Sequence, residues 1–592
     1  MPEYCFNNVD LYSLSTGESV TSLSAFSSPV DEYRSAFQKK TELFLNYYTF
    51  LEDEVQERTL TRGEFWELAI LAATYLSEQG LSKGDRIVHG FSSNNLYDLV
   101  FRLAASLLGS VPVTINWQAD NNERILYKAK VTNAKLVVCD SDFANRIDEI
   151  RPELSGVPLL EATNIDNYKP TGRWDFAPVK WDDEKMIIFT SGTTGKPKGV
   201  SLSHRAYLAN KLTFEQYFEM SKATQLDLLL ANPLHHTNST ALSDWAMRRS
   251  GAIIHLLQRY STNYWKILVE VASNKRDLLI APMVSRHIDF LQDLSAQSSL
   301  LGEEDKIKKA LSETEILIGS APVGPTTTKR ILKFSNHLPN VRFGSTETCL
   351  QVMATPRTMS KNELIEAFEA GWSHHYKEEK AIGYYIGREH FPLTRVKVVK
   401  SIDPESKDYF QPCEDGEPGY LITQGPNIMS YYVDNQEGTK AVFRKGWYTG
   451  LKDIVFTLKN NKDGQLDYYW MTRNSELLIR GGANYAYAQI AADLSEVLME
   501  DFQLKPDQFK VAVVGLRLGS EHEDSCCVTI ELSKEAFRVE SELKATFIER
   551  AEKKVPKGTV PNYVRFAKIP LNFKGAILYS QLKQDFLHYL SR

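Results

Sequence analysis

Short apolar runs alternate with longer stretches of helical periodicity along most of the 592 residues. Apolar positions three and four apart predict one helix over residues 62–79 and a second over residues 96–110. The runs IVHGF and VPVTIN, one after each helix, predict strands, and similar runs recur as KLVVCD, KMIIFT, DLLLAN, EILIGS and VKVVK. Strands separated by helices favour parallel sheets covered by helices, so the predicted fold class is α/β.

The pattern changes near residues 473–475, after the loop-rich stretch KNNKDGQLDYYW. Beyond it, AQIAADLSEVLMEDF and ESELKATFIERAEKKV predict helices, and KVAVVGL and CCVTIEL predict strands. This tail has enough apolar alternation to fold by itself. We therefore predict a large N-terminal domain over residues 1–472, a hinge at 473–475, and a small, mobile α/β C-terminal domain over residues 476–592.

Composition argues against nucleic-acid-binding, disulfide-rich and membrane-spanning classes of protein. The 69 Lys and Arg against 75 Asp and Glu give a net charge of -6, which indicates neither a nucleic acid nor an acidic membrane as partner. Six scattered cysteines argue against a disulfide framework and for a reducing compartment. No secretory leader and no apolar run of membrane-spanning length stands out, so we expect a cytoplasmic protein without a membrane span.

The most informative segment is MIIFTSGTTGKPKGVSLSH, residues 186–204. Glycines let backbone N–H groups converge into a concave anion cradle, while hydroxyls donate to phosphate oxygens and lysines add positive charge. Only two residues separate Gly192 from Gly195, so this is not the Walker loop of kinases and ATPases. Ser203 is a good N-cap for a following helix. A plain surface loop is the alternative, because these residue types are common in loops.

In this order of residues, the segment resembles the phosphate loop of the adenylate-forming (AMP-binding) superfamily. That superfamily includes acyl-CoA synthetases, the adenylation domains of peptide synthetases and beetle-type luciferases. Further motifs follow in the order of the family: PLHHTNS, GSAPVGP, FGSTET, GEPGYLITQGPNIMSYY, GWYTGLKD and MTRNSELLIRGGANYAY, with LSKGDR preceding them all. Such enzymes join a carboxylate to AMP, release pyrophosphate, and pass the acyl group to a thiol or another acceptor.

The resemblance implies a set of site residues. Glu347 would hold Mg²⁺, Thr346 would reach the α-phosphate, Lys198 would face the β- and γ-phosphates, and His236 would adjoin the acyl pocket. Those four are the implied catalytic residues. The residues implied to bind ATP are Thr190, Ser191, Gly192, Thr193, Thr194, Gly195, Lys198, Gly319, Ser320, Ala321, Pro322, Phe343, Gly344, Ser345, Thr346, Asp453 and Arg473.

Several of these residues have a structural alternative; for Glu347 it is a solvated acid in a turn. Phe343 would lie beside adenine or serve as a core aromatic. Asp453 would accept the ribose hydroxyls with Arg473 donating nearby, whereas Arg473 could instead be a surface charge at the domain seam. His236 is assigned to binding, because a lone histidine is more often a structural hydrogen-bonding residue. The glycine pair at 481–482 resembles the lining of a phosphopantetheine route, and a tight turn before a helix is its alternative.

The chain departs from the family in one important place. The family carries a lysine after a glycine near the C-terminus, and the matching stretch PLNFKGAI has Ala576 there. Lys574 lies two residues earlier and is a candidate substitute. Two smaller departures are Leu451 and Lys452, which stand between the Thr-Gly pair and Asp453, and a serine at position 475 of the hinge.

From the sequence we therefore predict an AMP-forming acid–thiol ligase, with adenylation weakened by Ala576. It would use ATP and Mg²⁺, a small-molecule carboxylic acid, and CoA or a carrier-protein thiol, with CoA as the expected co-substrate. One alternative is a catalytically impaired nucleotide- or acyl-binding homologue. Another is an adenylate-forming enzyme with a non-thiol outcome, such as an amide, a lactone or an oxidation.

Overall fold

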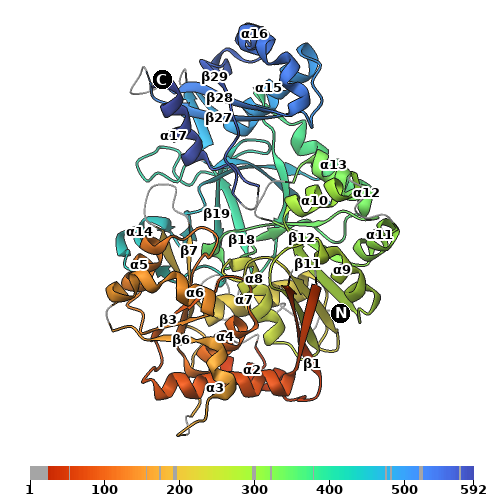
Figure 1. Cartoon of the computed structure of the whole chain (residues 1–592). Coiled ribbons are helices and arrows are strands. Elements are labelled where there is room, and N and C mark those ends of the chain that lie inside the picture. The colour runs from red at the N-terminus through yellow and green to blue at the C-terminus, as the bar shows by residue number, and fades with distance from the viewer. Residues whose placement is uncertain are drawn as a thin grey trace.

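The computed structural model shows a broad body topped by a smaller domain, which Figure 1 draws in blue. This confirms a mixed α/β fold with a large N-terminal part and a small C-terminal part. Residues 474 and 475 lie outside the described residues, so the boundary at 473–475 stays a prediction. The structure describes residues 24–51, 54–154, 156–172, 175–190, 197–296, 302–319, 323–377, 379–473, 476–480, 483–518, 524–572 and 575–591.

The first sheet has seven strands in the order β20-β8-β7-β4-β3-β5-β6. Strands β3 to β6 run parallel, β7 joins β4 in parallel, and β8 returns antiparallel to β7. The predicted strands IVHGF, VPVTIN, KLVVCD and KMIIFT all lie in this sheet. The strands are β3 (Arg86–Gly90), β4 (Val111–Thr114), β5 (Leu136–Cys139), β6 (Leu159–Glu161), β7 (Glu184–Thr190), β8 (Lys198–Ser203) and β20 (Tyr431–Tyr432).

The second sheet has fifteen strands, and its central part is parallel in the order β10-β9-β11-β12-β13, with β1 parallel to β10. The predicted strands DLLLAN and EILIGS belong to this part. The strands are β1 (Leu43–Leu51), β2 (Glu54–Thr61), β9 (Leu226–Leu230), β10 (Ala252–Leu257), β11 (Leu278–Met283), β12 (Glu315–Ile318) and β13 (Asn340–Phe343).

The remaining strands of this sheet pair antiparallel, which differs from the parallel arrangement expected for VKVVK. That run forms β18, antiparallel to β19. No described helix joins β18 to β19, and a parallel pairing usually needs such a crossover helix. The strands are β14 (Met353–Ala354), β17 (Tyr384–Glu389), β18 (Arg395–Val399), β19 (Gly419–Gln424), β21 (Phe443–Arg444), β22 (Trp447–Tyr448), β23 (Asp453–Lys459) and β24 (Leu466–Arg473).

Helices cover both sheets, and their ends follow local capping chemistry. The helices of the body are α2 (Pro29–Ala36), α3 (Arg62–Glu78), α4 (Leu96–Leu108), α5 (Asn122–Val131), α6 (Ser141–Arg146), α7 (His204–Tyr217), α8 (Thr237–Met247), α9 (Asn263–Ser273), α10 (Ser285–Ala296), α11 (Glu304–Ser312), α12 (Pro325–Phe334), α13 (Lys361–Trp372) and α14 (Gln436–Val442). Thr61 and Glu64 form a capping box before α3, and Asn95 caps α4, which ends at the left-handed Gly109. Ser203 caps α7, as predicted.

The C-terminal domain has its own apolar core, which includes Leu494, Val514, Phe547 and Phe586. The sequence pattern predicted α15, α16, β27 and β28, but not β25, β26, β29 and α17; part of the expected glycine-rich turn, Ala483–Ala486, is strand β26. The elements are β25 (Leu477–Arg480), β26 (Ala483–Ala486), α15 (Tyr487–Asp501), β27 (Phe509–Leu516), β28 (Ser525–Leu532), α16 (Glu540–Glu552), β29 (Tyr563–Phe566) and α17 (Tyr579–Leu590).

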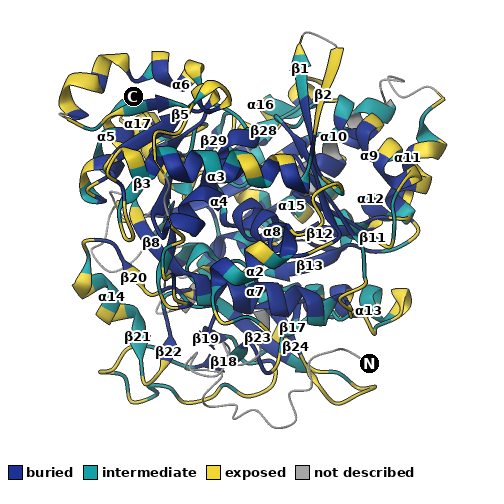
Figure 2. Ribbon diagram, turned by 90° about the horizontal axis from the view of Figure 1, so that it is seen from below, coloured by how far each residue is buried: buried dark blue, intermediate teal, exposed yellow. Residues whose placement is uncertain are grey.

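A buried ionic cluster fixes helix α8 at the centre of the body, where Figure 2 shows mostly dark blue ribbon. The Asp244 carboxylate pairs with Arg248 Nε at 2.7 Å and with Lys185 Nζ at 2.8 Å. Arg248 Nη1 also lies 2.7 Å from Glu32 Oε2 on α2. All four side chains are almost completely buried, so the cluster ties α2, β7 and α8 together beneath the site described below.

Two further features bear on the environment of the protein. The five cysteines within the described ranges are free thiols: Cys139, Cys349, Cys413, Cys526 and Cys527. Of the helices that the structure describes, none combines the length and the apolar character that crossing a bilayer requires.

Candidate functional site

The predicted phosphate loop joins the ends of two adjacent antiparallel strands. Thr190 ends β7 directly opposite Lys198, which begins β8. Residues 191–196 lie outside the described residues, so the roles predicted for Ser191, Gly192, Thr193, Thr194 and Gly195 stay predictions. The structure does place the two ends of the loop together at one end of the first sheet.

Lys198 and Glu347 converge on a tyrosine that sequence reasoning did not single out. Lys198 Nζ lies 5.0 Å from the centre of the Tyr432 ring, and the Tyr432 hydroxyl donates to Glu347 Oε1 at 3.1 Å. Strand β20 places Tyr432 beside β8, because Tyr432 pairs with Val200. Burial, and secondarily the Glu347 carboxylate, raises the pKa of Tyr432 far above its ordinary value, so this hydroxyl stays protonated and keeps donating.

The turn that carries Glu347 is held by close backbone contacts. A Cβ on Gly344 would lie 1.6 Å from the Leu350 carbonyl oxygen, so only glycine fits there. The Met429 amide donates to the Glu347 carbonyl at 2.7 Å, and Asn427 Nδ2 donates to the Thr348 carbonyl at 2.8 Å. The segment between β19 and β20 therefore fastens the acidic turn to the strand that carries Lys198.

The donors around Glu347 fit a magnesium ion held mainly by substrate phosphates. Within the described part of the chain, no three His, Cys, Asp or Glu side chains gather around one point as a complete metal cage would require. Mg²⁺ usually takes only one or two carboxylates, together with waters and phosphate oxygens. The single carboxylate of Glu347 fits this pattern.

Asp453 and Arg473 meet across a pair of antiparallel strands, β23 and β24. Trp470 Nε1 donates to Asp453 Oδ1 at 2.7 Å, and Arg473 Nε lies 3.4 Å from the same oxygen. Burial raises the pKa of the Asp453 carboxyl, and Arg473 opposes that effect. Lys452 takes a left-handed conformation (φ 57°) immediately before the strand, so the chain turns there into β23.

The predicted histidine segment lies at the start of α8, next to the acidic turn. His236 is the residue before the helix, and Thr237 Oγ1 donates to Thr346 Oγ1 at 3.0 Å. The ring of His235 lies 4.2 Å from that of His236 and 5.6 Å from that of Trp117. The structure therefore brings together the predicted acyl-side residue His236 and the predicted α-phosphate residue Thr346.

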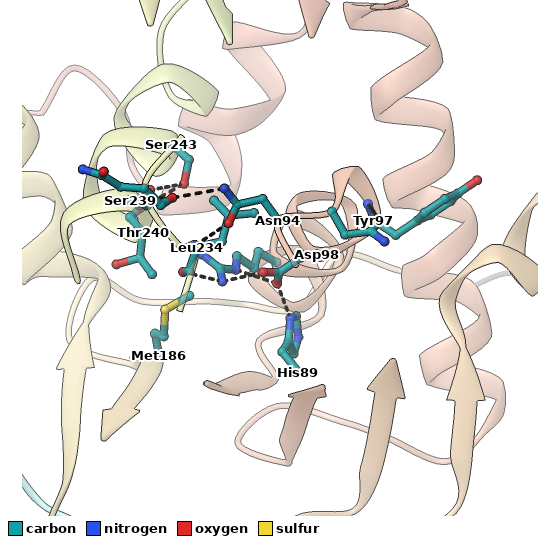
Figure 3. A network of polar contacts seen from close by, with 12 residues as sticks. His89, Asn94, Tyr97, Asp98, Met186, Leu234, Ser239, Thr240 and Ser243 are labelled. Carbon is teal, nitrogen blue, oxygen red and sulfur yellow. Dashed lines mark hydrogen bonds and ion pairs between the residues drawn. The ribbon is translucent and has the colours of Figure 1, made fainter. Parts of the chain in front are cut away.

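Helix α4 and Asn94, which lies just before it, hold this histidine segment in position. Figure 3 shows Asn94 reaching Leu234: Asn94 Oδ1 accepts from the Leu234 amide at 2.8 Å. Asn94 Nδ2 donates to the carbonyls of Leu257 at 2.9 Å and Asn232 at 3.2 Å. Arg102, paired with Asp98, donates to the Leu234 carbonyl at 2.8 Å, and the Asp98 carboxylate contacts His89. These bonds satisfy both backbone groups of Leu234, so the segment has a defined path.

We expect Asn94→Ala to lower the free energy of unfolding by about 2 kcal/mol, because it leaves buried backbone groups of Leu234 and Leu257 without partners. Urea unfolding followed by far-UV circular dichroism measures this. Substitution of the solvent-facing Glu67 on α3 by alanine is a control that should leave the midpoint unchanged. An Asn94 variant as stable as the natural protein would show that the network does not hold the segment.

The structure describes only some of the remaining predicted residues. Gly319 follows β12, while Ser320, Ala321 and Pro322 lie outside the described residues. Phe343 ends β13, half-buried against an apolar cluster, and Gly344 and Ser345 connect it to the turn of Thr346. Tyr432 lies within the motif GEPGYLITQGPNIMSYY, but the motif alone did not indicate its contacts with Lys198 and Glu347. No such motif pointed to Asn94, Arg102 or Arg342.

Comparison with known proteins identifies the family. The sequence profile described as "AMP-binding enzyme" matches residues 36–433, about two thirds of the chain. The chain belongs to this family. The match covers the loop after β7, the turn of Glu347 and strand β20, and it ends before Asp453.

Individual relatives agree with that assignment. A 2-succinylbenzoate–CoA ligase of Bacillus velezensis is 24% identical over 457 residues, which cover 74% of this chain and 78% of that protein. The mitochondrial medium-chain acyl-CoA ligase ACSF2 of Mus musculus is 26% identical over 568 residues, 88% of this chain and 82% of that one. The crystal structure of ATP-bound MatB from Rhodopseudomonas palustris matches with a TM-score of 0.72 at 20% identity, covering 94% of this chain and 99% of that chain.

Proposed function

We propose that this AMP-binding enzyme activates a carboxylic acid as an acyl-adenylate and transfers the acyl group to a thiol, with CoA as the acceptor. The observation that carries the proposal is the meeting of Lys198 and Glu347 at Tyr432, with Asp453 close enough to interact electrostatically with Glu347. Binding a nucleoside triphosphate requires a cation, a carboxylate that holds the metal, and a buried carboxylate that accepts hydrogen bonds from the ribose hydroxyls. Lys198, Glu347 and Asp453 are these three groups in the proposal.

Each group has a defined task in this proposal. Lys198, at the start of β8, neutralises the charge of the terminal phosphates. Mg²⁺, when bound at Glu347, would lower the repulsion between the incoming carboxylate and the triphosphate. Asp453 accepts hydrogen bonds from the ribose hydroxyls, and Trp470 and Arg473 fix the orientation of the Asp453 carboxylate. Thr346, tied to Thr237, stands between the nucleotide and the acid.

CoA is proposed as the acceptor because the two relatives above are named as CoA ligases. A carrier-protein thiol would serve the same chemistry. The five cysteines within the described ranges are free thiols, which suits a reducing compartment, and we propose the cytoplasm.

Ala576 favours the alternative of an impaired homologue. It follows the left-handed Gly575 in a tight turn, where the Ala576 amide donates to Asn572 Oδ1 at 3.0 Å and the Asn572 amide donates to the Ala576 carbonyl at 2.9 Å. A methyl group here carries no charge and cannot stabilise a carboxylate or a phosphate. Lys574, the candidate substitute, lies outside the described residues.

We expect Ala576→Lys to raise acid-dependent ATP–pyrophosphate exchange at least tenfold. The new ammonium would stabilise charge that develops in the transition state, where one lost donor costs about 3–4 kcal/mol, or roughly 10²–10³ in rate. Ala576→Met adds similar bulk without charge and is the matched control, which should not raise exchange. Equal exchange in all three proteins would mean that Lys574 or another group already fills this role.

The proposed function is tested by incubating the protein with ATP, Mg²⁺ and a panel of carboxylic acids, with and without CoA. We expect pyrophosphate release that depends on the acid, an acyl-adenylate detected by mass spectrometry, and a thioester only when CoA is present. Binding of ATP without pyrophosphate release for any acid would favour the impaired homologue. Acyl-adenylate that yields no thioester with CoA would favour a different acceptor.

A further inference from the structure

Arg342 is a buried cation whose guanidinium group is only partly used. It is 6% exposed and lies on β13, between Val341 and Phe343. Its Nη2 donates to Asn238 Oδ1 at 2.6 Å. Its Nε and Nη1 have no hydrogen-bond partner within the described part of the chain.

The other buried arginines that the structure describes have a carboxylate partner. Six described arginines are less than a tenth exposed, and five of them lie between 2.7 and 3.9 Å from a carboxylate oxygen. Arg342 is the exception among these six. They are Arg62, Arg102, Arg248, Arg249, Arg342 and Arg565.

A buried guanidinium without a carboxylate partner lowers the stability of the folded protein. A buried charge is tolerated when it is paired and its N–H groups are satisfied. Burial lowers the pKa of Arg342 to about 10, and no described carboxylate acts against that effect. An unpaired but still charged guanidinium in the interior is suited to a ligand that brings the negative charge.

The position of Arg342 indicates which ligand that is. Side chains alternate along a strand, so Arg342 points to the opposite face from Phe343, the residue predicted to adjoin adenine. Its Nε lies 3.5 Å from the place a Cβ on Gly319 would take, so the absence of a side chain at 319 leaves room for the guanidinium. Its partner Asn238 directly follows Thr237, which contacts Thr346. The guanidinium therefore lies beside the site, close to α8 and on the face of β13 opposite to Phe343, the residue predicted to adjoin adenine.

We propose that Arg342 binds a second carboxylate of the acid substrate, so that this enzyme activates a dicarboxylic acid at one end and holds the other end by charge. This inference rests on the proposed function, because it names the class of acid used at the same site. Asn238 acts as a positioning residue that orients the guanidinium. The reacting carboxylate is not the ligand of Arg342, because a carboxylate held by a buried guanidinium is stabilised in the ground state and attacks phosphorus less readily.

The test compares acids that differ only in the second charge. The probes are malonate, succinate, glutarate, adipate and phthalate, each beside its monomethyl ester and a monocarboxylic acid of equal length. Two quantities are measured: kcat/KM for pyrophosphate release, and acid affinity by calorimetry in the presence of a non-hydrolysable ATP analogue and Mg²⁺. We expect at least one diacid to exceed its monomethyl ester by roughly 100-fold or more in both, since a site that pairs a buried group strongly rejects analogues lacking the partner.

Variants then assign that preference to the residue. Arg342→Leu should reduce the preference for the diacid to within about tenfold, mainly through KM, while monoacids are affected little. Arg342→Lys should keep part of the preference, because it retains the charge. The thermal midpoint and the affinity for MgATP serve as controls for folding and for the nucleotide site.

Three results would overturn the proposal. One is the absence of a diacid preference over the esters across the panel, and another is a preference that survives in Arg342→Leu. The third is an equal loss of kcat/KM for monoacids and diacids in that variant, which would indicate that Arg342 binds the reacting carboxylate or has a structural role. Failure of the proposed function looks different: no acid would release pyrophosphate, while the calorimetric comparison of diacid and ester would still report on Arg342.

Discussion

Replacing Glu347 by glutamine should lower acid-dependent pyrophosphate release by roughly 10²–10³-fold. The amide has nearly the same shape as the carboxylate but is neutral, so it binds Mg²⁺ far less well and leaves the phosphate charge uncompensated. The turn itself should survive, since it is held by the Met429 amide and by the contact between Gly344 and Leu350. The rate is measured at saturating ATP over a range of Mg²⁺ concentrations, where the variant should require more metal.

Tyr432→Phe is the matched control for Glu347→Gln. It removes one hydrogen bond from the Tyr432 hydroxyl to the Glu347 carboxylate and keeps both the ring beside Lys198 and the negative charge. A smaller loss than that of Glu347→Gln is expected, because the carboxylate that would hold the metal is kept; the hydrogen bond that is lost ends on a charged group and contributes about 1.5–3 kcal/mol. If Glu347→Gln kept its rate within tenfold of the natural protein, Glu347 would not be the metal ligand.

Replacing Arg248 by methionine should lower the free energy of unfolding by about 3–5 kcal/mol. Arg248 lies between two buried carboxylates, those of Asp244 and Glu32, at 2.7 Å from each. Removing it leaves both acids buried with fewer partners, which costs far more than an exposed ion pair would. Because α8 carries the histidine segment, loss of substrate affinity should accompany the loss of stability.

Urea unfolding at neutral pH, with a global fit of midpoint and slope, measures this effect. Lys553→Met is the control: it removes the exposed pair with Glu549 on α16 and should leave the midpoint unchanged within error. A change in Arg248→Met no larger than that in Lys553→Met would mean that the cluster contributes little to stability.

Local patterns predicted many elements of the fold. Helices α3 and α4 and strands β3 and β4 follow from apolar periodicity, and the start of α7 follows from Ser203 as a cap. The antiparallel pairing of β18 could not be predicted in this way, because strand direction depends on how distant segments return to the sheet. Strands β25, β26 and β29 were missed because each is only four residues long, and helix α17 was missed because Tyr579–Leu590 mixes apolar and polar positions.

The same division holds for the site. Lys198, Glu347 and Asp453 were predicted from motifs that resemble those of the family, and their roles remain predictions. Tyr432, which contacts Lys198 and Glu347, was not named, because nothing in the sequence says that the strand after GPNIMS lies beside the strand that Lys198 begins. Arg342 was missed for a different reason. Its Nε and Nη1 have no hydrogen-bond partner within the described part of the chain, and this can be recognised only in the three-dimensional structure.

The affinity of the purified protein for ATP, measured by calorimetry with and without Mg²⁺, tests the central claim most directly. The account predicts that ATP binds with Mg²⁺ present, that binding weakens at least about tenfold when EDTA removes the metal, and that Glu347→Gln weakens it to a similar extent. No measurable affinity for either ATP or AMP at millimolar concentrations, with Mg²⁺ present and the protein folded, would contradict the account.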